Sequence, residues 1–111
     1  MIVVNRFRVD GDLPGGAEAL RADLHAALAA LAARPGYVSG SVGRNVDDPG
    51  LWLLTTTWAD PGSYRRALSS YDVKVAAVPV LSRALDEPSA YEVDDPSSGS
   101  VLNESRPRET G

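Results

Sequence analysis

The stretch Leu51-Trp52-Leu53-Leu54-Thr55-Thr56-Thr57-Trp58, followed by Ala59-Asp60-Pro61-Gly62, says most about how this chain folds. Its first eight residues are large aliphatic, β-branched or aromatic, which favours a β-strand. Asp60 and Pro61 are typical of a helix N-cap and the first helical position, so a helix is predicted over Pro61–Ser69. A strand leading directly into a helix is therefore the centre of the predicted fold.

The segments on either side extend this unit in both directions. Further strands are predicted over Ile2–Val9, Tyr37–Val46 and Ser89–Val93. Further helices are predicted over Ala17–Arg34, which Pro35-Gly36 ends, and over Asp72–Leu85, which Pro79 should bend or break. In the second of these helices Val75, Val78, Leu81 and Leu85 are expected to point inward.

The resulting order is βαββαβ, which predicts an α+β, ferredoxin-like fold with a four-stranded antiparallel sheet and helices on one face. The chain of 111 residues fits one domain. Residues 1–93 are expected to fold. Residues 94–111 contain only Val101 and Leu102 as sizeable apolar side chains, so they predict a flexible C-terminal tail.

Composition excludes several classes of function. With no Cys and one His, the chain offers no disulfide, no thiol nucleophile and no multi-histidine metal site, so neither a metal nor a cofactor is expected. A net charge of −4 argues against a nucleic-acid partner. No apolar segment reaches the roughly 20 residues that span a bilayer, so a cytoplasmic protein without a membrane partner is expected.

The strand over Leu51–Trp58 is apolar on both faces. Leu51 and Leu53 point one way, whereas Trp52, Leu54 and Trp58 point the other. A sheet covered by helices on one side and by water on the other should alternate apolar and polar residues. The pattern therefore predicts a homodimer in which a second copy covers the open face.

A candidate site combines polar groups with aromatic side chains. Asn5 lies mid-strand on the same face as Phe7, where an amide is unusual and could orient a ligand. Trp58 ends its strand, and Tyr64 follows on the next helix, so an apolar cleft with an indole N–H, a phenol and an amide is predicted. The alternatives are an Asn satisfied by neighbouring backbone and two ordinary core aromatics. Further candidate ligand contacts are Phe7, Arg44, Tyr71 and Lys74.

Three short motifs in this order of elements resemble the antibiotic biosynthesis monooxygenase (ABM) family. They are Asn5-Arg6-Phe7, the stretch Arg34-Pro35-Gly36-Tyr37-Val38, and Thr56-Thr57-Trp58. The resemblance covers about residues 1–93 and implies a homodimer whose two sheets form a dimeric α/β barrel, with a pocket between helices and sheet in each protomer. It also implies oxidation chemistry on a small aromatic or hydrophobic ligand.

Within the family, the members that oxygenate aromatics without metal or flavin fit this chain better than the haem-degrading ones. Trp58 and Tyr64 match a Trp and a Tyr of the former, although an Asn found four residues before that Trp is Leu54 here. Of the haem-degrading residues only Asn5 is matched, since Ala67 and Ala77 stand where a Trp and a His would be. Haem degradation is therefore not expected.

Two hypotheses follow. The first is a cofactor-independent monooxygenase that oxidises a polycyclic, quinol- or anthrone-type aromatic with O₂, with Asn5, Trp58 and Tyr64 as its catalytic residues. The second is a non-catalytic or accessory dimeric module that binds a small hydrophobic ligand in the same pocket. The absence of an obvious general base in the predicted cleft favours the second hypothesis, and the retained Asn5, Trp58 and Tyr64 favour the first.

Overall fold

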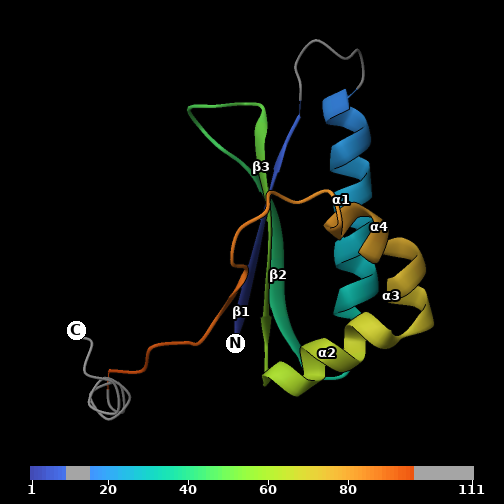
Figure 1. Cartoon of the computed structure of the whole chain (residues 1–111), viewed down its shortest axis with the longest axis vertical. Helices are drawn as coiled ribbons and strands as arrows, with labels where there is room; N and C mark the ends of the chain where they lie inside the picture. The colour runs from blue at the N-terminus through green and yellow to red at the C-terminus, as the bar shows by residue number, and fades with distance from the viewer. Residues whose placement is uncertain (10–15, 97–111) are drawn as a thin grey trace.

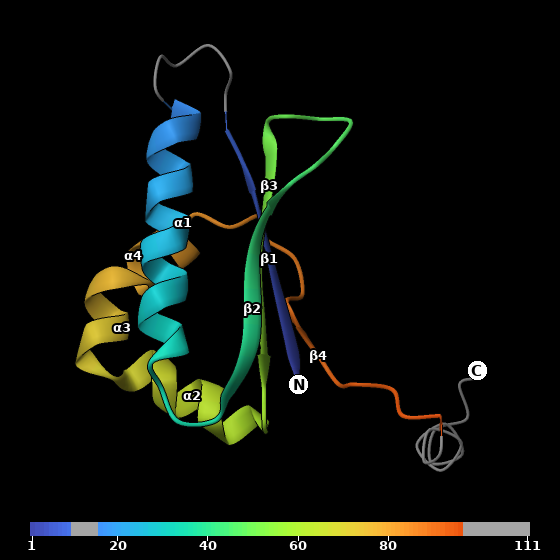
Figure 2. The same ribbon diagram turned by 180° about the vertical axis from the view of Figure 1, so that it is seen from behind.

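The computed structural model describes residues 1–9 and 16–96, and it has two layers. Figures 1 and 2 show the strands stacked edge-on, with all four helices on one side of them. The sheet has four strands in the order β2-β3-β1-β4, and every pair is antiparallel. The α+β, ferredoxin-like architecture predicted from the sequence is confirmed. The sheet of the single chain is open.

Element bounds agree closely with the sequence-based ones in the first half of the chain. The strands are β1 (Ile2–Arg8), β2 (Tyr37–Arg44), β3 (Leu51–Trp58) and β4 (Ala90–Tyr91), so β4 is much shorter than predicted. The helices are α1 (Gly16–Ala32), α2 (Pro61–Ser69), α3 (Tyr71–Ala76) and α4 (Val78–Leu81). Residues 97–111 of the predicted tail lie outside the described residues.

The core lies between the helices and the covered face of the sheet. Burial alternates along the whole of β3, and Trp52, Leu54, Thr56 and Trp58 are its buried residues. From the helix side, α1 contributes Leu20, Leu24, Ala27 and Leu31. These residues follow the 3.6-residue period, because apolar side chains at that spacing share one helix face.

The predicted break in the helix over Asp72–Leu85 is confirmed, but two of its predicted inward residues, Val75 and Val78, are exposed. The segment forms two short helices that meet at Ala77, because Pro79 cannot donate a backbone hydrogen bond and fits best in the first turn of a new helix. The inward residues are Val73, Ala77 and Val80, whereas Val75 is 59% exposed. The residues that face the core therefore differ from those expected of one continuous helix.

The turn between α1 and β2 depends on a glycine. Gly36 has a φ of +88°, and a Cβ at this position would overlap the Ser63 side chain of α2. We expect Gly36→Ala to lower the free energy of unfolding by at least about 1–2 kcal/mol, because left-handed backbone and the overlap both oppose a side chain. Urea denaturation measures this loss. Gly43→Ala is the matched control, since a Cβ there would meet only the Leu53 side chain at 3.9 Å. Equal losses in the two variants would contradict the prediction.

Helix α2 begins with a carboxylate cap. Asp60 Oδ1 accepts hydrogen bonds from the Ser63 backbone N–H at 2.8 Å and the Ser63 hydroxyl at 3.1 Å. These bonds hold the pKa of Asp60 below its ordinary value, and the bond from the backbone N–H has the larger effect. Because the pKa of Asp60 is lower in the folded state, the charged cap stabilises the protein fully at pH values above the unfolded-state pKa of about 4. This stabilisation is lost as the pH falls through the pKa of the folded state.

We therefore expect Asp60→Ala to lower the thermal unfolding midpoint at neutral pH. The difference from the unmodified protein should shrink as the pH is taken below about 4, because the unfolded state then takes up a proton while the folded state keeps the carboxylate charged until the pH reaches its lowered pKa. Calorimetry at a series of pH values from 7 to 3 measures it. A difference that is constant over this range would contradict a charged cap.

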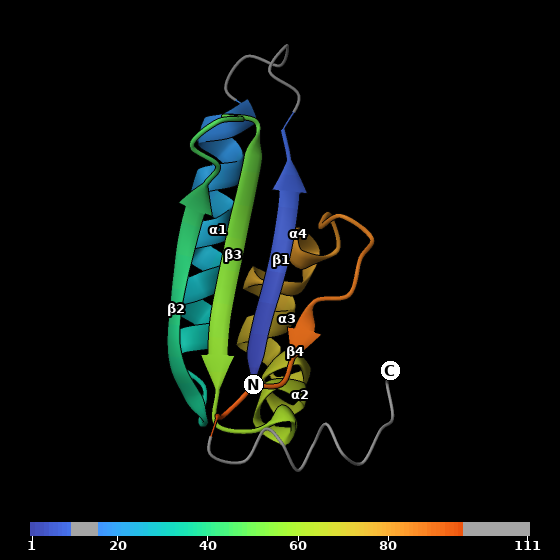
Figure 3. The ribbon, with the colours of Figure 1, turned by 90° about the vertical axis from the view of Figure 1, so that its left-hand side faces the viewer.

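The open face of the sheet is visible in Figure 3, where the strands lie in front of all the helices. Among its residues, Ile2, Val4, Leu51 and Leu53 are apolar and half-buried by their neighbours. Ion pairs flank them: the Arg6 guanidinium binds both Glu87 carboxylate oxygens at 2.7 Å, and Arg8 lies 2.9 Å from Asp48. No helix within residues 1–9 and 16–96 is long and apolar enough to cross a membrane.

Candidate functional site

A groove of about 440 Å³ opens on the helix side of the molecule, where α2 faces α4. It is lined by Tyr64, Leu68, Val78, Leu81 and Ser82. Tyr64 and Leu68 share one face of α2 because residues four apart are neighbours on a helix. The break at Ala77 turns α4 so that Val78 and Leu81 form the opposite wall. The groove is therefore mainly apolar, with a phenol as its largest polar group.

The Tyr64 phenol meets an amide that the sheet supplies. Asn5 lies on β1 opposite Leu54, on the covered face between the buried Val3 and Phe7. Burial raises the pKa of the Tyr64 phenol, and a hydrogen bond with the Asn5 side chain offsets part of that rise. Because the net shift is upward, the phenol remains protonated at neutral pH and can donate a hydrogen bond. The structure thus brings together two of the three residues predicted to be catalytic.

Trp58, the third, lies behind Tyr64. Its side chain is 1% exposed, and the centroids of the Trp58 and Tyr64 rings are 5.4 Å apart. The indole N–H donates to the Thr56 hydroxyl at 2.8 Å, so this donor is already used inside the protein. The predicted cleft with this N–H pointing into it is therefore not what the structure shows, because Thr56 lies two residues earlier on the same strand face and takes up the donor.

Tyr37 also packs against Trp58 and is not among the predicted site residues. The two ring centroids are 5.6 Å apart and the rings are nearly perpendicular, at 84°. Tyr37 begins β2 and pairs with Trp58 in the sheet register. The sequence does contain a signal for this residue, because Tyr37 directly follows the Pro35-Gly36 pair that ends the helix and lies within one of the three motifs.

The four predicted ligand contacts are elsewhere. Phe7 is fully buried in the core opposite Trp52, Tyr71 is 79% exposed at the start of α3, and Lys74 is also exposed. None of them is among the residues that line the groove. Arg44 lies at the far end of β2, with its guanidinium carbon 5.4 Å from the centre of the Trp52 ring.

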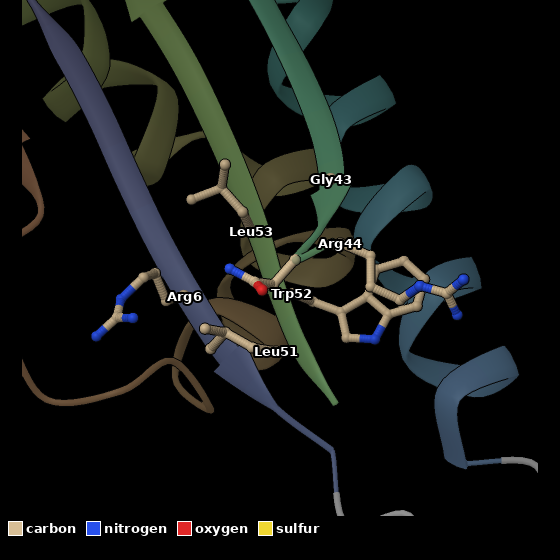
Figure 4. Close-up of a pocket in the computed structure, with 7 residues that line it drawn as sticks. Arg6, Gly43, Arg44, Leu51, Trp52 and Leu53 are labelled. Atoms are coloured by element: carbon tan, nitrogen blue, oxygen red, sulfur yellow. The ribbon is translucent and has the colours of Figure 1, made fainter. Parts of the chain in front are cut away.

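A second, smaller hollow of about 210 Å³ surrounds that end of the sheet. Figure 4 shows Arg44 beside the Trp52 indole, on the side where α1 lies, while Arg6 extends to the opposite side. The hollow shares no lining residue with the Tyr64 groove. Arg44 therefore belongs to a different part of the molecule from Asn5 and Tyr64.

Charged and metal-binding groups are placed away from the groove. His25 is exposed on α1. Within the described ranges, no three His, Cys, Asp or Glu side chains are grouped so that they could hold a metal ion. Of the five residues that line the groove, none is a carboxylate or an imidazole. What the arrangement offers chemically is an apolar surface with a neutral hydrogen-bond donor, the Tyr64 phenol held beside the Asn5 amide.

An open ferredoxin-like sheet, covered on one face by helices that form a mainly apolar groove, defines a small α+β domain. The family model for antibiotic biosynthesis monooxygenase matches residues 1–78. The chain belongs to this family, as the motifs around Asn5, Tyr37 and Trp58 indicated. No curated protein sequence matches the chain.

Solved structures agree with this membership. A variant of SnoaB, a cofactor-independent oxygenase from Streptomyces nogalater, is 28% identical, with a TM-score of 0.57 over 76% of this chain and 82% of that one. Rv0793 from Mycobacterium tuberculosis is 22% identical, with a TM-score of 0.64 over 86% of this chain and 96% of that one. A conserved protein from Methanosarcina mazei Go1 is 20% identical, with a TM-score of 0.63 over 80% and 84%. The last two show likeness of fold alone.

Proposed function

We propose that the chain is a cofactor-independent monooxygenase that oxidises a polycyclic, anthrone- or quinol-type aromatic with O₂ in the groove between α2 and α4. The observation that carries the proposal is the half-buried Tyr64 phenol, hydrogen-bonded to Asn5 at the wall of an apolar groove, where it is a neutral hydrogen-bond donor. Membership of the family and the similarity to SnoaB, an oxygenase without a cofactor, support it.

The chemistry needs no electron carrier because the substrate supplies the electrons. An anthrone-type CH₂ group loses a proton to give a carbanion stabilised by the ring system, and this carbanion reduces O₂ and binds it as a hydroperoxide. Loss of water then leaves a carbonyl, so one oxygen atom stays on the ring and the other leaves as H₂O. The phenol and the amide would stabilise the negative charge on the substrate oxygen as it develops.

The proton that the substrate loses needs an acceptor. Because no carboxylate or imidazole is among the groove-lining residues, we assign this role to solvent water at the open mouth of the groove. Tyr64 is unsuited to act as the base because its raised pKa keeps it protonated. Turnover should therefore increase with pH as more of the substrate is ionised.

One observation favours a second function, the binding of a hydrophobic ligand without turnover. The Trp58 N–H is engaged by Thr56, which removes one of the three polar groups on which the catalytic hypothesis relied. Oxygen uptake with anthrone and with a hydroquinone, measured alongside ligand-induced quenching of tryptophan fluorescence, distinguishes the two functions. Uptake supports the oxygenase, quenching without uptake supports the binding module, and neither signal rejects both.

The Asn5→Ala variant adds a test of the site itself. We expect it to lower the oxygen-uptake rate about tenfold, because the Tyr64 phenol loses its hydrogen-bond partner. Asn45→Ala is the matched control: the Asn45 amide oxygen accepts backbone N–H groups of residues 47 and 48, in the turn between β2 and β3. Equal rates in the two variants would reject the assignment of the site to the groove.

We also propose that the protein is a homodimer joined through the open face of the sheet. The half-buried Ile2, Val4, Leu51 and Leu53 give that face an apolar centre, and the Arg6–Glu87 and Arg8–Asp48 pairs lie beside it. A two-fold interface uses the same patch on both copies, which suits a self-complementary apolar centre with charges of both signs around it. The groove lies on the opposite side of the sheet and so stays open to ligand.

A further inference from the structure

The buried Thr56 is unusual for the covered face of this sheet. It is 2% exposed and is flanked on that face of β3 by Leu54 and Trp58. A valine of nearly the same shape would fill this position without burying a hydroxyl, and burial of a hydroxyl is unfavourable unless it is hydrogen-bonded. Here the hydroxyl accepts the Trp58 indole N–H at 2.8 Å. The threonine therefore supplies a specific acceptor as well as volume.

That hydrogen bond restricts the orientation of the indole. A tryptophan ring without a polar partner is held only by packing, whereas a bond to its one N–H fixes which edge faces the strand. The Trp58 ring is tilted 50° from Tyr64 on one side and is 84° from Tyr37 on the other. Both tyrosine rings therefore contact an indole whose orientation Thr56 restricts.

We propose that Thr56 is a positioning residue: by accepting the indole N–H it holds Trp58 in the orientation against which the Tyr64 ring packs, and so fixes the place of Tyr64 at the wall of the groove. The inference rests on the proposed function for its catalytic consequence, but the positioning of Tyr64 can be tested separately. It also assigns Trp58 an indirect role, since Trp58 is buried and is not among the lining residues of the groove. Of this cluster only Tyr64 lines the groove, so its phenol is the hydrogen-bonding group nearest a ligand, and the Asn5 amide acts behind it as the partner of that phenol.

The test compares Thr56→Val, which removes the acceptor at constant shape, with Thr56→Ser, which keeps it. Nuclear magnetic resonance of ¹⁵N-labelled protein reports the Trp58 indole N–H, which is assigned by its loss in Trp58→Phe, and ¹³C-labelled tyrosine reports the Tyr64 ring. We expect both signals to shift in Thr56→Val and to return close to their original positions in Thr56→Ser. Thr55→Val, whose side chain lies on the open face, is the control and should leave both signals in place.

Kinetics with anthrone provide the second readout. Thr56→Val should lower kcat about tenfold because the Tyr64 phenol is displaced, while KM should change less than twofold because the groove is intact. Thr56→Ser should restore kcat. A Tyr64 signal that does not move in Thr56→Val, or a kcat that Thr56→Ser fails to restore, would overturn the proposal. If the unmodified protein shows no turnover, the proposed function is rejected, and the Tyr64 signal alone decides the role of Thr56.

Discussion

Replacing Tyr64 with phenylalanine is expected to lower kcat/KM for an anthrone by about a hundredfold. The change removes one oxygen atom and leaves the ring that packs on Trp58, so the fold and the groove should be preserved. Loss of one well-placed donor to a developing oxyanion typically costs between a hundred- and a thousandfold in rate. We expect the lower end of that range because Asn5 remains beside the site.

The pH dependence makes this prediction sharper. Since burial raises the pKa of the Tyr64 phenol, the unmodified protein should keep its donor until the pH exceeds the ordinary tyrosine value of about 10. Its rate should therefore rise with substrate ionisation and decline only above that pH. In Tyr64→Phe the decline should be absent, because no phenol is left there to ionise.

A control with the same chemical change is available at β4. The Tyr91 hydroxyl donates to the Pro88 carbonyl oxygen at 3.3 Å, away from the groove, so Tyr91→Phe should keep the full rate. A Tyr64→Phe variant that retains a third or more of the activity would contradict the donor role. Circular dichroism of both variants confirms that each is folded.

Replacing Leu53 with arginine is expected to convert the proposed dimer into a monomer. Leu53 lies on the open face of β3 with Arg6 and Gly43 as its register partners, so its side chain is at the middle of the three long strands. In a two-fold interface the substitution enters twice, which places two unpaired guanidinium groups in the apolar centre. Light scattering at micromolar concentration measures the resulting mass.

Val75→Arg is the matched control because Val75 is 59% exposed on α3, on the helix side of the molecule. This variant should have the same mass in solution as the unmodified protein. An unmodified protein that is already monomeric, or a Leu53→Arg variant that stays dimeric, would contradict the proposed interface. Since the groove lies on the other side of the sheet, the monomeric variant should still quench on ligand addition.

The sheet could be predicted because its strands carry clear local patterns. The aliphatic, β-branched and aromatic residues of 51–58 predict the strand, its period of two predicts the two faces, and Asp60-Pro61 correctly marks the start of α2. The residues of α3 and α4 that face the core could not be predicted in the same way. Pro79 indicates a break, but α3 has only six residues, too few for the spacing of apolar residues to decide whether Val73 or Val75 faces the core.

The candidate site was predictable where it depended on strand faces and not where it depended on register or rotamers. The meeting of Asn5 and Tyr64 could be predicted because alternation along β1 places Asn5 on the covered face, where α2 lies. Arg44 was misplaced because the antiparallel register pairs it with Trp52, at the opposite end of β3 from Trp58. The acceptor for the Trp58 N–H depends on side-chain rotamers, which the order of residues does not reveal.

The short helix α4 has a consequence for how such a protein could diversify. Of its four residues, Val80 is buried in the core, while Val78 and Leu81, together with the following Ser82, form one wall of the groove. Val78 and Ser82 are exposed, so substitutions at these two positions can reshape the ligand-facing wall while the sheet and α1 keep their packing, whereas Leu81 also packs against the core. A new substrate preference could arise through a few changes in this one helical turn, which makes it the natural place for a directed-evolution library.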